Sequence, residues 1–221
     1  LANSFVMCQS LQQVSIPPTV TSIGEAAFSK CINLQSIEIP QTVTAIEKLA
    51  FSGCSSLVSI HLPSNLTGVS RYVFSMCSNL RSIVIPAGVT TIESGAFSSC
   101  TKLISITIPS TVTRIENSVF ANCSSLELIT LPDSVSFIGD YAFLNCSKLA
   151  SITIPSRVVS FGQSVFRGCL NLNSISYHLL TDTQRSNYLF YIINHTSIEV
   201  SIPAQYSSTT IFQVPIKKPD Q

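Results

Sequence analysis

The sequence has few charged residues and no long uninterrupted apolar run. Charged residues make up 10% of the 221 residues, and 12 lysines and arginines against 11 aspartates and glutamates give a net charge of +1. This balance excludes a surface that binds nucleic acid or membranes by charge. No stretch approaches the roughly 18 apolar residues of a membrane span, so the 45% hydrophobic content predicts many short buried segments instead.

Motifs for catalysis and metal binding are missing as well. Zinc sites need cysteine pairs such as C-x-x-C, and the sequence contains none. Its three histidines, His61, His178 and His195, stand in no metal-ligand spacing, and its 8 glycines form no phosphate-binding loop. We therefore expect no enzymatic activity, no catalytic residues, no bound metal and no cofactor.

The N-terminus lacks the features of a complete secreted precursor. The first residue, Leu1, is not an initiator methionine, and polar residues follow it closely. Such a segment does not form a signal peptide. We expect the chain to be part of a longer protein.

A repeat of 23 residues runs through most of the chain. It aligns a cysteine, a phenylalanine three residues before it and a leucine three residues after it. The cysteines are Cys8, Cys31, Cys54, Cys77, Cys100, Cys123, Cys146 and Cys169. In most repeats Ile-x-Ile-Pro or a close variant follows the leucine, and then a valine and an isoleucine three residues apart. Such a period with L-x-x-I-x-I at its centre is typical of leucine-rich solenoids.

Each repeat is expected to form one coil with a short strand on one side. Near Leu34, the alternation of Ile37, Glu38 and Ile39 places two side chains inward and one outward, as in a parallel sheet. Pro40 then removes the backbone donor that would extend the strand. The rule for parallel crossovers predicts a right-handed solenoid. Its strands are predicted around Ile37, Ile60, Ile83, Ile106, Ile129, Ile152 and Ile175.

The other side of each coil is predicted to form a short helical turn. Ala27, Phe28 and Cys31 lie at three- and four-residue spacing, which places them on one helical face. The column before each cysteine predicts a left-handed, helix-ending residue, because it includes Gly53, Asn122, Asn145 and Gly168. The predicted fold class is an α/β repeat solenoid with one parallel sheet face and short helical turns on the other.

The repeat pattern divides the chain into three parts. Residues 1–176 contain eight repeats, of which the first and last are incomplete. Residues 177–203 are interpreted as a divergent capping coil, with a capping box at Thr181 and Gln184 that predicts a helix through about Ile193. A degenerate Ile-x-Ile-Pro follows at Val200, Ile202 and Pro203, and residues 204–221 are expected to form a tail or linker.

The repeat resembles the BspA-like class of leucine-rich repeats. The residues that carry the resemblance are Ile39, Pro40, Val43, Thr44, Ile46, Ala50, Phe51, Cys54, Leu57 and Ile60. The resemblance covers residues 1–176. It implies a cell-surface or secreted protein that adheres to host matrix proteins, host receptors or other cells.

The eight cysteines are interpreted as free thiols in the core. Their uniform position predicts a ladder of inward side chains about 4.8 Å apart. Parallel stacked side chains have the wrong relative orientation for a disulfide torsion. Buried free cysteine behaves as a small apolar residue, so we expect all eight to be reduced and protected.

The outward residues of the strands form the candidate binding surface. Most of them are small and polar, with serine dominating the column two residues after each leucine. Exposed apolar residues interrupt this surface at Val58, Val84, Ile104 and Leu128, and two charged residues, Arg81 and Glu127, lie in the same region. These six residues are candidates for binding a partner, although repeat drift explains isolated apolar substitutions equally well.

Glu38 and His61 occupy the same outward position in successive repeats. They are predicted to face each other, and such a pair supports acid–base chemistry in some proteins. No nucleophile stands out beside them, so we interpret them as a polar surface pair and add them to the candidate partner-binding residues.

Three functions remain open on the sequence alone. The first is a non-enzymatic adhesion module that binds proteins or glycans, and the second is a structural protein that self-associates end to end. The third is an intracellular scaffold, which free cysteines favour, so a cytoplasmic location stays open. Glycosylation also stays open, because four segments fit its sequon, at Asn65, Asn122, Asn145 and Asn194.

Overall fold

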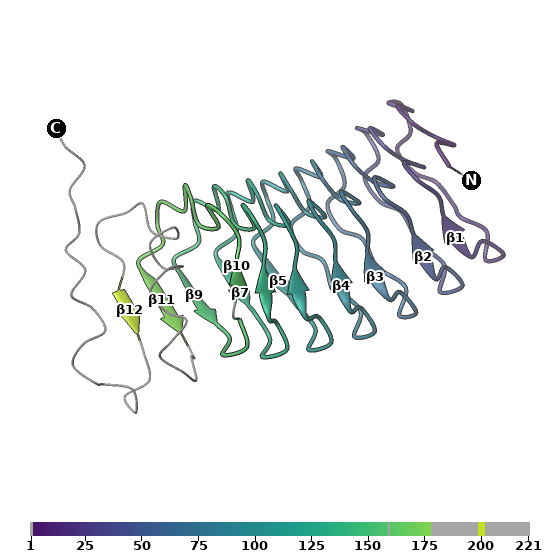
Figure 1. The fold of residues 1–221 in the computed structure, drawn as a ribbon. Helices are drawn as coiled ribbons and strands as arrows, with labels where there is room; N and C mark the ends of the chain where they lie inside the picture. The colour runs from purple at the N-terminus through teal and green to yellow at the C-terminus, as the bar shows by residue number, and fades with distance from the viewer. Residues whose placement is uncertain (1, 159, 178–198, 202–221) are drawn as a thin grey trace, which may run out of the picture.

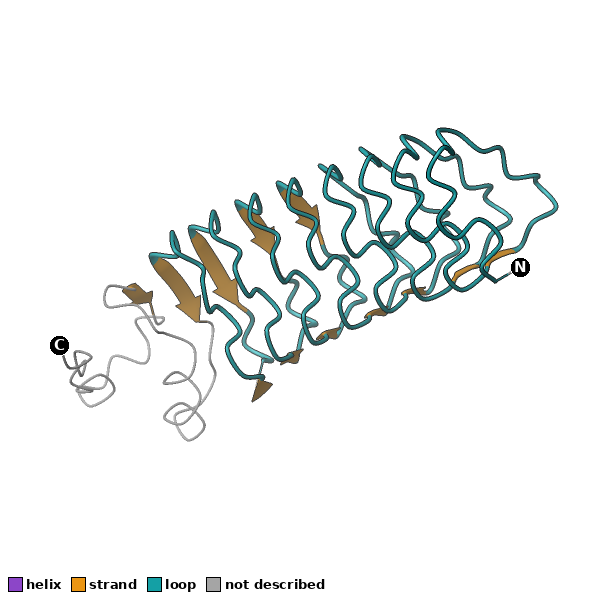
Figure 2. Cartoon of the chain, turned by 90° about the horizontal axis from the view of Figure 1, so that it is seen from above, coloured by secondary structure: helices purple, strands orange, loops and turns teal. Residues whose placement is uncertain are grey.

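The computed structural model describes residues 2–158, 160–177 and 199–201. The chain winds into an elongated solenoid in which each 23-residue repeat forms one coil (Figure 1). Successive coils lie side by side, and the N-terminus lies at one end of the stack. Two rows of short strands run along the solenoid on different sides (Figure 2).

The first row consists of the predicted Ile-x-Ile strands. Its members pair in parallel, with Ile106 opposite Ile129 and Ile152 opposite Ile175. These isoleucines are buried, as the alternation predicts. The strands are β5 (Ser105–Thr107), β7 (Leu128–Thr130), β9 (Ser151–Ile154), β11 (Ser174–Tyr177) and β12 (Glu199–Ser201).

β12 pairs with β11 and places Val200 opposite Ile175. The ladder therefore continues beyond the last regular repeat, despite a spacing of 25 residues instead of 23. The helix expected through Ile193 and the segment 204–221 lie outside the described residues.

The strands predicted around Ile37, Ile60 and Ile83 are wrong in extent. Only two isolated parallel bridges form in this part of the row, from Ser15 to Glu38 and from Val84 to Thr107. The three isoleucines are nevertheless buried. A proline also follows β5, β7 and β9 within two residues, so the proline does not account for the loss of pairing in these coils.

A second parallel row follows the valine of each repeat, which the prediction of a single sheet face missed. Its strands are two residues long, and the apolar residue that ends each strand is buried in all but the last, which ends at the half-buried Phe161. A spacing of three between valine and isoleucine does not indicate a strand. The strands are β1 (Ser22–Ile23), β2 (Ala45–Ile46), β3 (Gly68–Val69), β4 (Thr91–Ile92), β6 (Arg114–Ile115), β8 (Phe137–Ile138) and β10 (Ser160–Phe161).

The predicted helical turns are also wrong, because the described part of the chain contains no helix. Around Phe28, alternate backbone N–H groups donate within the coil and to the next coil. The N–H of Phe28 donates to the carbonyl of Ala50 at 2.8 Å, whereas the N–H of Cys31 donates to the carbonyl of Phe28 at 3.1 Å. An α-helix needs every N–H to donate four residues back, so this segment forms successive tight turns.

Two residues in each coil adopt a left-handed backbone conformation. The column before each cysteine does so in all eight repeats, as predicted, with φ between 57° and 77°. A second column, four residues earlier, has φ between 51° and 67°. The sequence does not reveal it, because it contains Asn3, Ala26, Leu49, Tyr72, Gly95, Ser118, Tyr141 and Ser164.

The core is a continuous stack of like side chains. Neighbouring phenylalanine rings, from Phe5 to Phe166, stack with centroids 5.2–5.8 Å apart and interplanar angles of 2–16°. The leucine and cysteine columns lie beside them, almost fully buried from Cys31 and Leu34 onward. Because each coil buries its apolar side chains against its neighbours, stability comes from stacking.

Candidate interaction surface

A column of four candidate residues crosses four successive coils. Their backbones are joined by hydrogen bonds: the N–H of Arg81 donates to the Val58 carbonyl at 3.1 Å, and that of Ile104 to the Arg81 carbonyl at 3.2 Å. The N–H of Glu127 donates to the Ile104 carbonyl at 3.0 Å. The structure therefore brings Val58, Arg81, Ile104 and Glu127 into one line along the solenoid.

The apolar candidates are exposed on four successive coils, and we call them together the apolar patch: Val58, Val84, Ile104 and Leu128. Their exposed fractions are 46%, 76%, 46% and 61% respectively. Val84 bridges to Thr107 one coil further on, and Leu128 lies opposite Ser105. Because the buried isoleucines fix the pleat, these side chains point away from the core.

The charged side chains around the apolar patch differ in their contacts. The Lys148 ammonium lies 3.0 Å from the Glu127 carboxylate, and the Lys102 ammonium donates to the Asn79 amide oxygen at 2.6 Å. The Arg81 guanidinium makes no ion pair or side-chain hydrogen bond with any described residue. Arg81 is thus available to a partner.

Hydroxyl groups on this face are also available to bind solvent or a partner, in contrast to hydroxyl groups elsewhere that link one coil to the next. Away from the face, hydroxyls tie the coils together, as when Ser124 donates to the Thr101 carbonyl at 3.4 Å. On β5, β7 and β9, the hydroxyls of Thr107, Thr130 and Thr153 make no hydrogen bond with described residues. The outward face thus keeps its polar groups for solvent or a partner.

Glu38 and His61 do not form the expected pair. Both side chains are exposed, and no hydrogen bond or ion pair joins them. Glu38 lies instead at an open hollow of about 690 Å³ between the first two coils, lined by residues such as Ser15 and Gln41. With no contact between the carboxylate and the imidazole, the arrangement does not support acid–base chemistry.

The cysteines form an inward ladder with one exception. Seven are buried, and Cys8, in the first coil, is exposed, which corrects the expectation of eight protected thiols. Each buried thiol donates a hydrogen bond to the phenylalanine carbonyl of the preceding coil. For Cys54 and Phe28 this distance is 3.1 Å, and for Cys100 and Phe74 it is 3.2 Å.

Burial changes the acidity of these thiols. It raises the pKa of Cys54 and Cys123 to about 12 and holds the pKa of Cys77 and Cys100 well above its ordinary value. A hydrogen bond with the neighbouring Cys169 thiol, together with burial, raises the pKa of Cys146. Thiols that stay protonated are poor nucleophiles and poor metal ligands.

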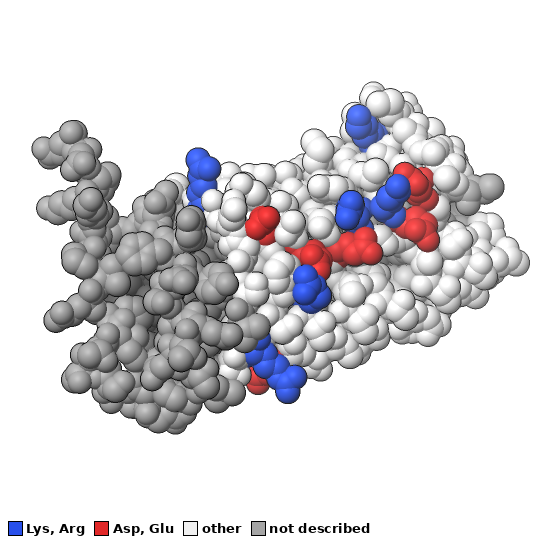
Figure 3. All heavy atoms as spheres, viewed as in Figure 1, with Lys and Arg blue, Asp and Glu red and all other residues white. Residues whose placement is uncertain are grey.

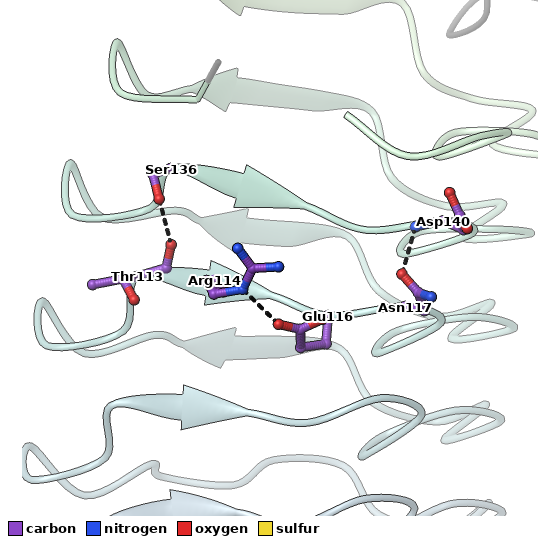
Figure 4. Close-up of polar contacts among 6 residues, drawn as sticks. All are labelled: Thr113, Arg114, Glu116, Asn117, Ser136 and Asp140. Atoms are coloured by element: carbon purple, nitrogen blue, oxygen red, sulfur yellow. Dashed lines mark hydrogen bonds and ion pairs between the residues drawn. The ribbon is translucent and has the colours of Figure 1, made fainter. Parts of the chain in front are cut away.

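Charged residues gather beside the second row of strands. Arg114 pairs with Glu116 at 2.7 Å and lies 4.0 Å from the centre of the Phe137 ring (Figure 4). One coil further on, the N–H of Asp140 donates to the Asn117 side chain at 2.9 Å. Acidic and basic side chains intermingle in a band along the solenoid (Figure 3). Mutually paired surface charges contribute little stability and offer little charge to a partner.

Of the four sequons, the structure describes three. The Asn145 amide donates to the Asn122 side-chain oxygen at 2.9 Å, so these two asparagines stack on each other. Asn65 is exposed in the turn before β3. Asn194 lies outside the described residues, as do His178 and His195.

The repeat matches a known sequence family along almost its entire length. The model of the BspA-type leucine-rich repeat region, which spans six copies of the repeat, matches residues 2–127 and 120–214. The chain belongs to the BspA-type leucine-rich repeat family. No curated protein has a sequence that matches this member of the family.

Solved structures of bacterial leucine-rich repeat proteins resemble this BspA-type chain. A leucine-rich repeat protein of T. pallidum is 33% identical, with a TM-score of 0.61 over 77% of this chain and 69% of its own. One from Bacteroides ovatus is 31% identical, with a TM-score of 0.58 over 80% of this chain and 58% of its own. A leucine-rich cell surface protein of Faecalibacterium prausnitzii is 28% identical, with a TM-score of 0.57 over 89% of this chain and 66% of its own. The chain thus spans less than two thirds of the length of the latter two proteins.

The described residues of this BspA-type chain provide neither a metal-binding cluster nor a membrane-spanning helix. They contain no group of three or more His, Cys, Asp or Glu side chains placed to hold a metal ion. None of their segments is a helix with the length and apolar character needed to cross a membrane. The repeat family and the exposed outward face point to protein interaction as the general role of the fold.

Proposed function

We propose that the chain is a non-enzymatic protein-binding module of a cell-surface or secreted protein, and that it adheres to host or matrix proteins. The observation that carries the proposal is the apolar patch. Four large apolar side chains are exposed on neighbouring coils, beside Arg81, whose guanidinium makes no ion pair or side-chain hydrogen bond with a described residue. Exposed apolar groups rimmed by polar residues are typical of protein-binding surfaces.

The location rests on the relatives. One of the similar structures is described as a cell surface protein. A stiff solenoid with an extended outward face also suits adhesion, because it presents many side chains at once without a loss of conformational entropy on binding.

The test is a double variant, Val84→Thr with Leu128→Ser, measured for binding to a panel of purified extracellular-matrix proteins. Both side chains lie outside the core, so thermal stability is expected to stay nearly unchanged. Binding is expected to weaken about tenfold or more, because central apolar contacts dominate interfaces. Leu170→Ser is the matched control, since Leu170 is 71% exposed but lies in another column. Equal binding by the wild type and the double variant would refute the proposal.

A second candidate function, end-to-end self-association, has its own support at the first coil. Phe5 and Met7 are 38% and 54% exposed there, and Phe5, Val14 and Ile16 line a hollow of about 280 Å³. The phenylalanines equivalent to Phe5 in the inner coils are buried, whereas Met76, which is equivalent to Met7, is itself 58% exposed, so the support comes from Phe5. Sedimentation velocity over a range of concentrations tests this function, and a mass that stays that of one chain would exclude it.

A further inference from the structure

The cations around the apolar patch are unequal in their availability. Lys148 and Lys102 already contact Glu127 and Asn79, as described above. Arg81 has no such contact, and its backbone is joined on either side to Val58 and Ile104. Within the described part of the chain, a guanidinium without an ion pair or side-chain hydrogen bond therefore lies on the coil between those that carry the exposed Val58 and Ile104.

The surroundings of Arg81 favour a carboxylate partner. Lys148 and Glu127 offset each other and Lys102 contacts the Asn79 amide, so the charge of Arg81 has no opposite charge in contact with it among the described residues. Once a partner covers the neighbouring apolar side chains, water is excluded and the attraction between opposite charges becomes stronger. A guanidinium binds a carboxylate through two parallel hydrogen bonds, a geometry that neither lysine offers.

The spacing of the patch favours an extended partner. Val58 and Ile104 are two coils apart, about 10 Å at the usual separation of paired strands. An extended polypeptide advances about 6.6 Å for every two residues, so an acidic residue seated on Arg81 places its near neighbours over Val58 and Ile104. Val84, the most exposed of the four side chains, lies three residues from Arg81 in the same coil.

We propose that the apolar patch binds an extended polypeptide segment in which an acidic residue contacts Arg81 and flanking apolar residues contact Val58, Ile104 and Val84. This inference rests on the proposed protein-binding function and specifies the chemistry of its partner. It differs from binding by general charge, because the whole chain carries a net charge of only +1.

The experiment uses a random peptide library displayed on phage, selected on the whole 221-residue chain. Peptides with Asp or Glu between apolar residues are expected to be enriched. Arg81→Gln should weaken the binding of those peptides about tenfold, a typical loss for an interfacial arginine. Selection on Arg81→Glu should instead enrich Lys or Arg at the same position. The matched control is Arg157→Gln, since Arg157 is exposed in the turn after β9, away from the patch.

The outcomes separate this inference from the proposed function. Acidic peptides that bind wild type and Arg81→Glu equally would overturn the role of Arg81. If peptides lose binding in the Val84→Thr, Leu128→Ser variant but show no acidic preference, the patch binds polypeptides and only the inference about the partner fails. If no selected peptide depends on Arg81 or on the patch, both proposals fail. Arg81→Gln leaves the core untouched, so a thermal melt like that of wild type confirms that it folds.

Discussion

At the scale of single residues, the contact between Cys54 and Phe28 shows how one coil is tied to the next. The Phe28 carbonyl accepts the backbone N–H of Cys31 at 3.1 Å and the thiol of Cys54 at 3.1 Å. Cysteine is thus both a small core residue and a donor to the preceding coil. Alanine would fill much of the same space but would leave the second contact unmade, which favours cysteine at this position in the seven repeats where the thiol is buried.

Cysteine reactivity follows from this arrangement. With an excess of a thiol reagent in native buffer, Cys8 is expected to react rapidly, because it is the exposed cysteine. The seven buried cysteines are expected to react only as fast as the coils open. Counting modified thiols by mass spectrometry at early times checks this expectation. Rapid modification of several thiols before denaturant is added would contradict it.

The second left-handed column, which contains Gly95 and Ser118, gives two substitutions with opposite effects. Ser118→Gly is expected to stabilise the protein by about 1 kcal/mol, because it relieves the cost of a left-handed side-chain-bearing residue. Gly95→Ala is expected to destabilise it by at least that amount. The backbone of Gly95 has a φ of +67°, which a residue with a side chain rarely adopts, and a Cβ at this position would overlap the Tyr72 ring. Urea unfolding of both variants provides the measurement, and changes of the same sign would contradict the account.

At the scale of elements, the sequence predicts the strands better than the turns. The alternation of Ile106 and its neighbours identifies a buried, parallel ladder, because a period of two is specific to strands. Phe28 and Cys31 lie three residues apart, a spacing shared by a helix and by successive tight turns. Only the path of the backbone donors, half of which leave for the next coil, separates the two. A single sequence does not show that path.

The candidate surface was predictable to a similar degree. Outward exposure of Val84 and Leu128 follows from the pleat once the core isoleucines are assigned. The contact expected between Glu38 and His61 does not form, because equal positions in neighbouring coils fix the backbones and leave long side chains free to point elsewhere. The pairing of Lys148 with Glu127, and the lack of such a pair for Arg81 among the described residues, depend on side-chain reach and were not predictable.

At the position directly after a strand of the second row, replacing glycine by a larger residue is expected to destabilise the protein. A Cβ at Gly139 would lie 2.4 Å from the Asn117 amide oxygen and 2.7 Å from its backbone nitrogen. Gly139→Ala should therefore destabilise the protein by about 1–3 kcal/mol through overpacking. Gly68→Ala is the control, since a Cβ there lies 3.1 Å from the Thr91 hydroxyl, which can rotate away. Equal melting temperatures for the two variants would contradict the packing described for Gly139.

At the scale of the whole molecule, the buried thiols are expected to make the folded protein less stable at alkaline pH. Below the ordinary thiol pKa of about 9, thiols are protonated in both the folded and the unfolded state, and their contribution to the free energy of unfolding is fully present. Above it, the unfolded chain releases protons that the folded chain retains, because burial holds the pKa of Cys54 and Cys123 at about 12. The free energy of unfolding is expected to fall by about 1.4 kcal/mol per pH unit for each such thiol.

Urea unfolding at several pH values between about 8 and 10.5 measures this slope. The variant Cys77→Ala with Cys100→Ala should show a shallower slope than wild type, because two of the thiols that resist ionisation are gone. The two proteins share every other ionisable side chain, so the difference between their slopes reports the two thiols. Identical slopes would show that these thiols ionise freely in the folded protein.

The stacked coils also give the molecule a distinct outward face, at which we propose that a partner binds. Methyl NMR spectra of the chain, recorded while a bound matrix protein or selected peptide is titrated in, test it most directly. The account predicts shifts at the methyl groups of Val58, Val84, Ile104 and Leu128, with buried Ile106 and Leu103 little changed. Shifts confined to Val6 and Met7 at the open end, or to the coil edges beside the second row of strands, would contradict it.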